Sequence, residues 1–265
     1  MSRNGPLMLA FHTLFMAFLL APIVLVCLVA FTPEGYLSLP TAGISLRWFK
    51  AVLAYPEFVN AFITSLWLAA ISSTIAVTTA TAAAIAIARY RFPGRDAITA
   101  LFMSPLVVPH VVLGIAFLRF FSAVGVAGTA TGLVLSHVIL IFPFALRLGL
   151  ASATGLERAL EHAAQSLGAT RARVLQRIVL PLIVPGIASG WMLSMIQSFD
   201  EVTMTVFVAS PTTTTLPVWM FNYIQFNIDP LICAVSTLLI VFTIVVMIVL
   251  EWLYGLERLF AGTGQ

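Results

Sequence analysis

Charge is scarce in this sequence. Charged residues make up 9% of its 265 residues, and hydrophobic residues make up 61%. A soluble globular domain carries about a quarter charged residues. The low charge therefore excludes an ordinary soluble protein, and without an acidic or basic tail nothing points to nucleic acid as a partner. The composition predicts an all-α integral membrane protein whose residues 1–265 form a single domain.

Lysine and cysteine are also nearly absent. Lys50 is the only lysine, so the sequence has no Gly-Lys-Ser/Thr segment to hold nucleotide phosphates. A P-loop ATPase is thereby excluded. Cys27 and Cys233 both lie in apolar runs, which indicates free thiols and no disulfide framework. We expect no metal site.

Long hydrophobic runs are what the sequence has in abundance. A helix needs about 20 apolar residues to cross the hydrocarbon core of a membrane. Several stretches reach this length, and prolines at Pro105, Pro109, Pro143, Pro181 and Pro185 predict kinks or helix starts. The predicted spans are 7–31, 58–88, 98–121, 132–150, 178–208 and 231–253.

Arginine placement predicts the orientation, because cytoplasmic loops are enriched in Arg and Lys. If both termini are cytoplasmic, the outer side holds only Arg47, Lys50 and Arg119. The inner side then receives Arg3, Arg89, Arg91, Arg95, Arg147, Arg158, Arg171, Arg173, Arg177 and Arg258. We therefore expect cytoplasmic N- and C-termini and a cytoplasmic loop at 151–177.

A short amphipathic segment lies in the first outer loop, at residues 45–53. It predicts a helix lying at the membrane interface, with Trp48 more an interface anchor than a ligand contact. Its two expected faces are Leu46, Phe49, Val52 and Leu53 on one side, and Arg47 and Lys50 on the other.

The cytoplasmic loop has a pattern of its own. One helix face is predicted from the spacing of Leu156, Leu160, Ala164 and Leu167. Small residues, Ala163, Ala164 and Gly168, would allow another element to approach closely. We expect Gly168 to end this helix and Thr170 to cap the next one, which enters the membrane at Leu180-Pro181. The alternative is a solvated loop with ordinary cytoplasmic arginines.

At these residues the sequence resembles a known family. The segment Glu161-x-Ala163-Ala164-x-x-x-Gly168, followed by Ile178-x-Leu180-Pro181, is similar to the EAA loop of ABC-importer permeases. The resemblance implies that Glu161, His162, Ala163, Ala164, Gly168, Leu180 and Pro181 couple the chain to an ATP-binding subunit. His162 stands where the family usually has a glutamate, so docking would depend more on the small residues and on shape.

The resemblance extends over most of the chain and is greatest to the second permease of spermidine/putrescine importers. It implies a type I (MetI-like) permease fold with about six transmembrane helices in a bacterial inner membrane. It also implies partners: an ATP-binding cassette ATPase dimer that binds ATP and Mg²⁺, a second homologous permease, an external substrate-binding protein and membrane lipid. This chain would be a transport subunit without a cofactor of its own, and not an enzyme.

Asp200 and Glu201 are the only acidic pair inside a predicted span, which suggests a substrate pathway. The resemblance implies that acidic residues at Ser198-x-Asp200-Glu201 attract a cationic substrate, and that Trp48 lies on the same path. The alternative is that the pair marks the outer membrane surface or caps a helix break before Pro211.

His110 stands where the resembling permeases can have an acid. A histidine there would favour a substrate with an anionic end, such as an aminoalkylphosphonate or an amino acid. His110 and His137 are also consistent with hydrogen-bonded histidines that face another helix.

Two other classes compete with an ABC permease. A secondary transporter or channel would need its own coupling-ion site near mid-membrane, and we find no convincing inverted repeat. An intramembrane serine protease would need a histidine base for Ser189 in Gly186-Ile-Ala-Ser189-Gly190, but no histidine follows Ser189 in the chain.

Overall fold

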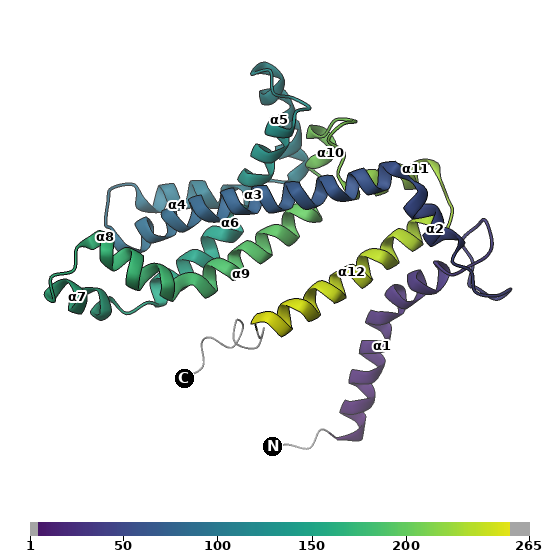
Figure 1. Cartoon of the computed structure of the whole chain (residues 1–265), viewed down its shortest axis with the longest axis horizontal. Coiled ribbons are helices and arrows are strands. Elements are labelled where there is room, and N and C mark those ends of the chain that lie inside the picture. Colours follow the sequence, from purple (N-terminus) through teal and green to yellow (C-terminus); the bar gives the residue numbers. More distant parts are fainter. Residues whose placement is uncertain (1–4, 255–265) are drawn as a thin grey trace. The chain divides into compact units, whose positions relative to one another are not determined.

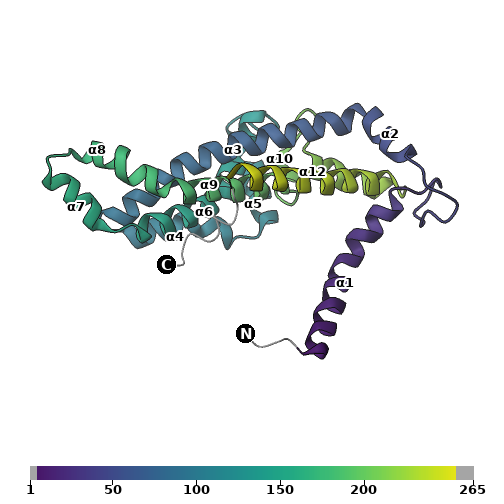
Figure 2. The ribbon, with the colours of Figure 1, turned by 60° about the horizontal axis from the view of Figure 1, so that its bottom comes forward.

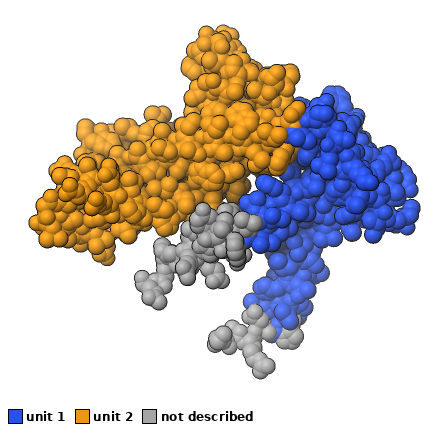
Figure 3. Space-filling model, viewed as in Figure 1, with its two compact units in different colours: residues 1–59, 220–256 blue, residues 60–219, 257–265 orange. Residues whose placement is uncertain are grey.

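The computed structural model describes residues 5–254, and within them it contains helices and no strands (Figure 1). Arg3 and Arg258, which contributed to the predicted orientation, lie outside the described residues. The chain divides into two compact units (Figure 3). Among the described residues, unit 1 comprises 5–59 and 220–254, and unit 2 comprises 60–219.

Unit 1 contains two long apolar helices. The helix α1 has exposed apolar side chains around its circumference, as expected of a lipid-facing helix. It contacts α12, which also contacts α2. The elements are α1 (Pro6–Val29), α2 (Arg47–Ala54), most of α11 (Leu216–Phe226) and α12 (Leu231–Tyr254).

The short helix α2 forms where the amphipathic segment predicts it, but a different face is buried. Trp48 and Val52 are 7% and 1% exposed, whereas Leu46 and Leu53 are 56% and 69% exposed. The expected apolar face is therefore wrong in part: Val52 is buried and Phe49 is half-buried, but Trp48, four residues before Val52, is buried in place of Leu46 and Leu53.

Unit 2 contains the remaining helices, several of which run side by side in both ribbon views (Figures 1 and 2). They are α3 (Pro56–Arg89), α4 (Arg95–Met103), the 3₁₀ turn η1 (Ser104–Leu106), α5 (His110–Ala123), α6 (Ala130–Gly155), α7 (Arg158–Ser166), α8 (Arg171–Val174), the π-helical turn η2 (Leu175–Val179), α9 (Leu180–Phe199) and α10 (Thr205–Val208).

Four described helices are long and apolar enough to cross a membrane: Leu7–Val29, Pro56–Arg89, Ala130–Gly155 and Arg171–Phe199. A fifth is counted if a bent pair forms one span. The predicted third span is this pair, Arg95–Leu106 and His110–Ala123, with a bend of 101° between the two helices. Pro109 lacks an amide hydrogen and disfavours helical geometry at the preceding residue, so it begins a new helix.

The predicted fifth span also has a different limit. It ends at Phe199, because the chain leaves the helix at Asp200 and forms the separate short helix α10. The predicted sixth span, 231–253, matches α12, Leu231–Tyr254.

Close packing of α6 against α9 dominates the interior of unit 2. Gly190 lies opposite the backbone of Ala145, 3.7 Å from where a β-carbon would stand, and Gly186 faces Ser152. The pair Gly186-x-x-x-Gly190 is thus a small-xxx-small contact face. Ser189, considered as a nucleophile, lies between these glycines, and its hydroxyl donates to the Pro185 carbonyl within the same helix.

Gly186→Ala should destabilise the protein. An added β-carbon would overlap the Ser152 hydroxyl and lie 2.7 Å from its β-carbon, so α6 and α9 would have to separate. Overpacking of this kind costs about 1–3 kcal/mol. The measurement is thermal unfolding of the purified chain in a lipid nanodisc.

Gly155→Ala is the control, because Gly155 is likewise a helical glycine, the last residue of α6, and no atom lies within 4 Å of an added β-carbon. Equal stability of the two variants would show that α6 and α9 do not pack as described.

Candidate functional site

The first candidate site lies at the α7 end of unit 2. The helix α7 stops at a Schellman motif, in which the Gly168 amide donates to the Gln165 carbonyl at 2.9 Å and the Ala169 amide donates to Ala164 at 3.0 Å. Gly168 has φ +87°, the left-handed conformation that favours glycine. The predicted helix end is confirmed.

Beyond the turn, the chain re-enters a helix as predicted. The Thr170 hydroxyl accepts a hydrogen bond from the Arg173 amide at 3.4 Å and caps α8. A π-helical turn, Leu175–Val179, then joins α8 to α9. Pro181 has no amide hydrogen to donate to the Arg177 carbonyl, which disfavours a regular α-turn at this point.

The residues of the EAA-like segment face two directions. Ala163, His162 and Gly168 are exposed, and an added β-carbon at Gly168 would lie in open space. Ala164 packs inward against a small core formed by Val174, Val179 and Ile183. Leu180 packs against the same core, whereas Pro181 is exposed.

Only part of the predicted apolar face of α7 packs against the core. Leu156 and Ala164 contact the core, but Leu160 and Leu167 are 46% and 90% exposed. The helix therefore presents an outward surface that combines small residues with two exposed leucines.

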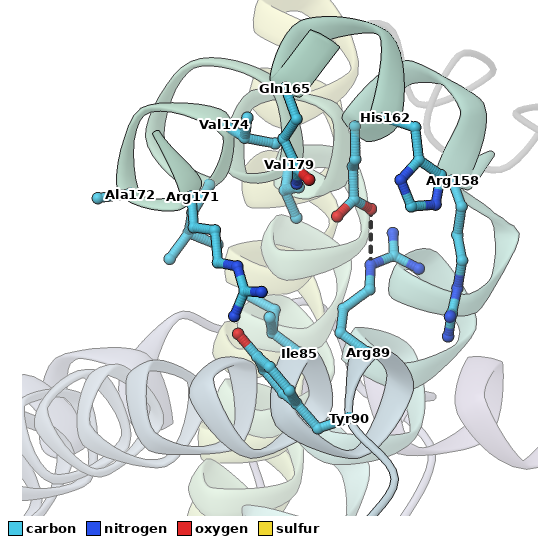
Figure 4. Close-up of a pocket in the computed structure, with 12 residues that line it drawn as sticks. Ile85, Arg89, Tyr90, Arg158, His162, Gln165, Arg171, Ala172, Val174 and Val179 are labelled. Atoms are coloured by element: carbon cyan, nitrogen blue, oxygen red, sulfur yellow. Dashed lines mark ion pairs between the residues drawn. The ribbon is translucent and has the colours of Figure 1, made fainter. Parts of the chain in front are cut away.

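Glu161 is held inside the chain. Its carboxylate lies 2.8 Å from Nε of Arg89, and the two side chains are 17% and 10% exposed (Figure 4). Arg158 on α7 makes a second contact with the end of α3, because its Nη2 donates to the Ala88 carbonyl at 2.9 Å. These contacts attach α7 to α3, and sequence reasoning missed them because the partners lie about 70 residues apart.

The second candidate site surrounds the end of α9. Ser198 is buried and hydrogen bonds to Nδ1 of His137 at 2.8 Å, and Nε2 of His137 hydrogen bonds to the Thr205 hydroxyl at 3.0 Å. His137 is 0% exposed. It thus bridges α6 to the residues on both sides of the break between α9 and α10, which agrees with a histidine that hydrogen bonds to another helix.

Glu201 makes two contacts in this break. One carboxylate oxygen accepts a hydrogen bond from the Met204 amide at 2.7 Å, and the other lies 2.9 Å from Nδ1 of His110 on α5. The Glu201 side chain is 7% exposed and that of His110 is 38% exposed. Glu201 therefore bonds to the backbone within the break that precedes α10, and the His110 imidazole has an acidic partner.

Asp200 differs from its neighbour. It is the C-cap residue of α9, it is exposed, and its side chain has no hydrogen bond or ion pair with other residues in the described part of the chain. A carboxylate at a helix C-terminus adds to the negative end of the helix dipole. The arrangement makes the end of α9 a place where positive charge is favoured.

Trp48 belongs to unit 1, whereas the other residues of the predicted pathway belong to unit 2. Its ring nitrogen donates to the Glu34 carbonyl at 3.2 Å, and the Arg47 guanidinium lies 4.7 Å from the ring centroid. Within residues 5–254 there is no group of three or more His, Cys, Asp or Glu side chains placed to hold a metal ion.

The sequence is similar to curated polyamine permeases. It is 28% identical over 239 residues to the spermidine/putrescine transport system permease protein PotC of Haemophilus influenzae, covering 90% of this chain and 93% of that protein. It is 32% identical over 231 residues to the putrescine transport system permease protein PotI of Escherichia coli strain K12, covering 84% of this chain and 82% of that protein.

Solved ABC transporters share the fold. A chain of a bacterial ABC transporter involved in the import of the acidic polysaccharide alginate superposes with a TM-score of 0.72 at 15% identity, covering 96% of this chain and 97% of that chain. A chain of the inward-facing MetNI methionine ABC transporter superposes with a TM-score of 0.60 at 16% identity, covering 78% and 96%.

A match to a family model shows which protein family the chain belongs to. Residues 76–256 match the model for the inner membrane component of binding-protein-dependent transport systems. This segment includes the EAA-like loop, the break after α9 and most of the helices of unit 2. The MetI-like permease fold expected from the EAA-like segment is confirmed. The chain is a multi-pass transport subunit and not an enzyme, and it belongs to the family of inner membrane components of binding-protein-dependent ABC importers.

Proposed function

We propose that this chain is one of two permeases of an importer for a polyamine such as putrescine or spermidine. An external binding protein delivers the substrate, and a separate ATPase dimer binds ATP and Mg²⁺ and drives transport. The relatives named for spermidine and putrescine transport support this choice, since they match most of the chain. The observation that carries it is the exposed Asp200 at the negative end of α9, whose side chain has no ion pair within residues 5–254.

The contact between His110 and Glu201 favours a cationic substrate. If His110 is protonated, the charge of Glu201 compensates it at 2.9 Å. If His110 is neutral, Glu201 adds a second negative charge beside Asp200. In both states the residues at the end of α9 carry net negative charge, so His110 is not a free cation for the anionic end of an amino acid or an aminoalkylphosphonate.

A continuous helical path joins the two candidate sites. The elements α8, η2 and α9 form one candidate span, Arg171–Phe199, of 29 residues. It begins beside the exposed Ala163 and Gly168 and ends at Asp200. We propose that the α7 surface docks on the cytoplasmic ATPase and that both chain termini are cytoplasmic. A displacement of α7 would then move the substrate end of α9.

Asp200→Asn should lower uptake of labelled putrescine by about tenfold or more, because one charge-assisted contact is worth about 1.5–3 kcal/mol. The variant His110→Gln should lose much less, because it leaves the carboxylates of Asp200 and Glu201 in place. Uptake is measured in proteoliposomes that contain the chain with its co-purified partners.

Matched measurements separate this role from misfolding. Recovery of all partner subunits with each variant is required, and competition by an amino acid or an aminoalkylphosphonate tests the other substrate classes. Unchanged uptake by Asp200→Asn, with competition only by a substrate bearing an anionic end, would refute the polyamine assignment.

Gly168→Leu should uncouple ATP hydrolysis from uptake. Within the chain an added side chain at Gly168 meets open space, so the cost beyond backbone strain is the contact with the docked ATPase. The expected result is loss of most substrate uptake while the ATPase still hydrolyses ATP. Both rates are measured on the same proteoliposomes.

Gly125→Leu is the control for strain. Gly125 has φ +78°, close to that of Gly168, and it also faces open space. If the two variants lose uptake equally, the defect at Gly168 comes from the strained turn and not from docking.

A further inference from the structure

A cavity lined by charged and apolar side chains lies behind α7, where α3 ends and α8 begins (Figure 4). Its volume is about 490 Å³. Ile85, Val174 and Val179 give it an apolar side, and Val174 and Val179 belong to the small core below α7. The cavity therefore lies where the ends of two candidate membrane spans meet, at residues 89 and 171.

Positive charge is in excess in this cavity. Three arginines, Arg89, Arg158 and Arg171, line it together with His162, and Glu161 is the one carboxylate among the residues around it. Glu161 lies within ion-pair distance of Arg89, and within the described residues no carboxylate lies within that distance of Arg158 or Arg171. Two guanidinium charges thus lack an acidic partner among residues 5–254.

Arg89 also has hydrogen-bonding capacity that the chain does not use. Its side chain is nine-tenths buried, at 10% exposure, and the buried Nη2 has no hydrogen-bond partner. Its Nε and Oε1 of Glu161 are close but lack the alignment of a hydrogen bond. An unsatisfied buried guanidinium is costly, so an oxyanion that reaches Nη2 would be stabilised.

We propose that this cavity is a binding site for a phosphate oxyanion, supplied by the headgroup of an anionic phospholipid or by free inorganic phosphate. Guanidinium groups match phosphate geometry and bind it by two parallel hydrogen bonds. Basic pockets at the ends of transmembrane helices suit anionic headgroups, and the apolar side of the cavity would lie beside the lipid chains. The bound phosphate would link α3 to α7 and α8.

The test uses the full-length chain with its co-purifying subunits in nanodiscs. One preparation contains phosphatidylcholine alone, a second includes phosphatidylglycerol, and a third is phosphatidylcholine with added inorganic phosphate. The midpoint of thermal unfolding is measured in each. A rise with phosphatidylglycerol alone assigns the site to lipid, and saturation by inorganic phosphate assigns it to the free ion.

Two variants probe the site itself. Arg171→Gln removes an exposed lining charge, and Arg89→Lys keeps a positive charge for Glu161 but removes Nη2. Both should weaken the apparent affinity for the phosphate source by about tenfold or more, because each loses a charge-assisted hydrogen bond. Arg173→Gln is the control, since it changes the net charge of α8 equally but does not line the cavity.

The proposal would be overturned if Arg171→Gln, Arg89→Lys and Arg173→Gln changed the apparent affinity for phosphate equally. It would also be overturned if neither phosphate source raised the unfolding midpoint of the wild type. Loss of the ATPase from Arg171→Gln without any phosphate response would instead assign the cavity to an acidic side chain of that subunit. None of these outcomes depends on the transported substrate, so the polyamine proposal is tested separately.

Discussion

The close approach of α6 and α9 is the constraint on which the rest of unit 2 depends. Glycines at 186 and 190 let the two helices approach closely, with Ser152 and Ala145 opposite. In a membrane, helices associate through such packing and through hydrogen bonds, because lipid is as apolar as the helix surface. The same approach brings His137 of α6 to Ser198 of α9, which holds the acidic end of α9 in position.

Much of the fold is readable from local patterns. Apolar length predicts α1, α3, α6 and α12, and the Gly168 and Thr170 signals predict where α7 ends and α8 begins, since all of these depend on neighbouring residues. The 101° bend after Leu106 and the burial of Trp48 are not readable in this way. They depend on which elements pack together, as do the contacts of Glu161 with Arg89 and of Glu201 with His110. The glycine contact face of α9 was available in the sequence as a small-xxx-small pattern.

The two acidic residues after α9 illustrate how neighbours in sequence acquire different roles. Glu201 is buried, and its carboxylate contacts both a backbone amide and an imidazole, so it stabilises the conformation of the break. Asp200 is exposed at the end of the helix, so its charge remains available to an incoming ligand. Sequence alone groups them as one acidic pair, because burial and partner choice are set by α5 and α10.

The π-helical turn at Leu175–Val179 changes the direction in which side chains point at one end of the span Arg171–Phe199 relative to the other end. A π turn holds about one residue more than an α turn, and one residue corresponds to about 100° of rotation. Side chains from Leu180 onward therefore face a different direction from the one that an uninterrupted α-helix would give them. The angular register between the arginines of α8 and Asp200 is thus set by five residues, and a deletion of one residue there would rotate one end against the other without changing either sequence.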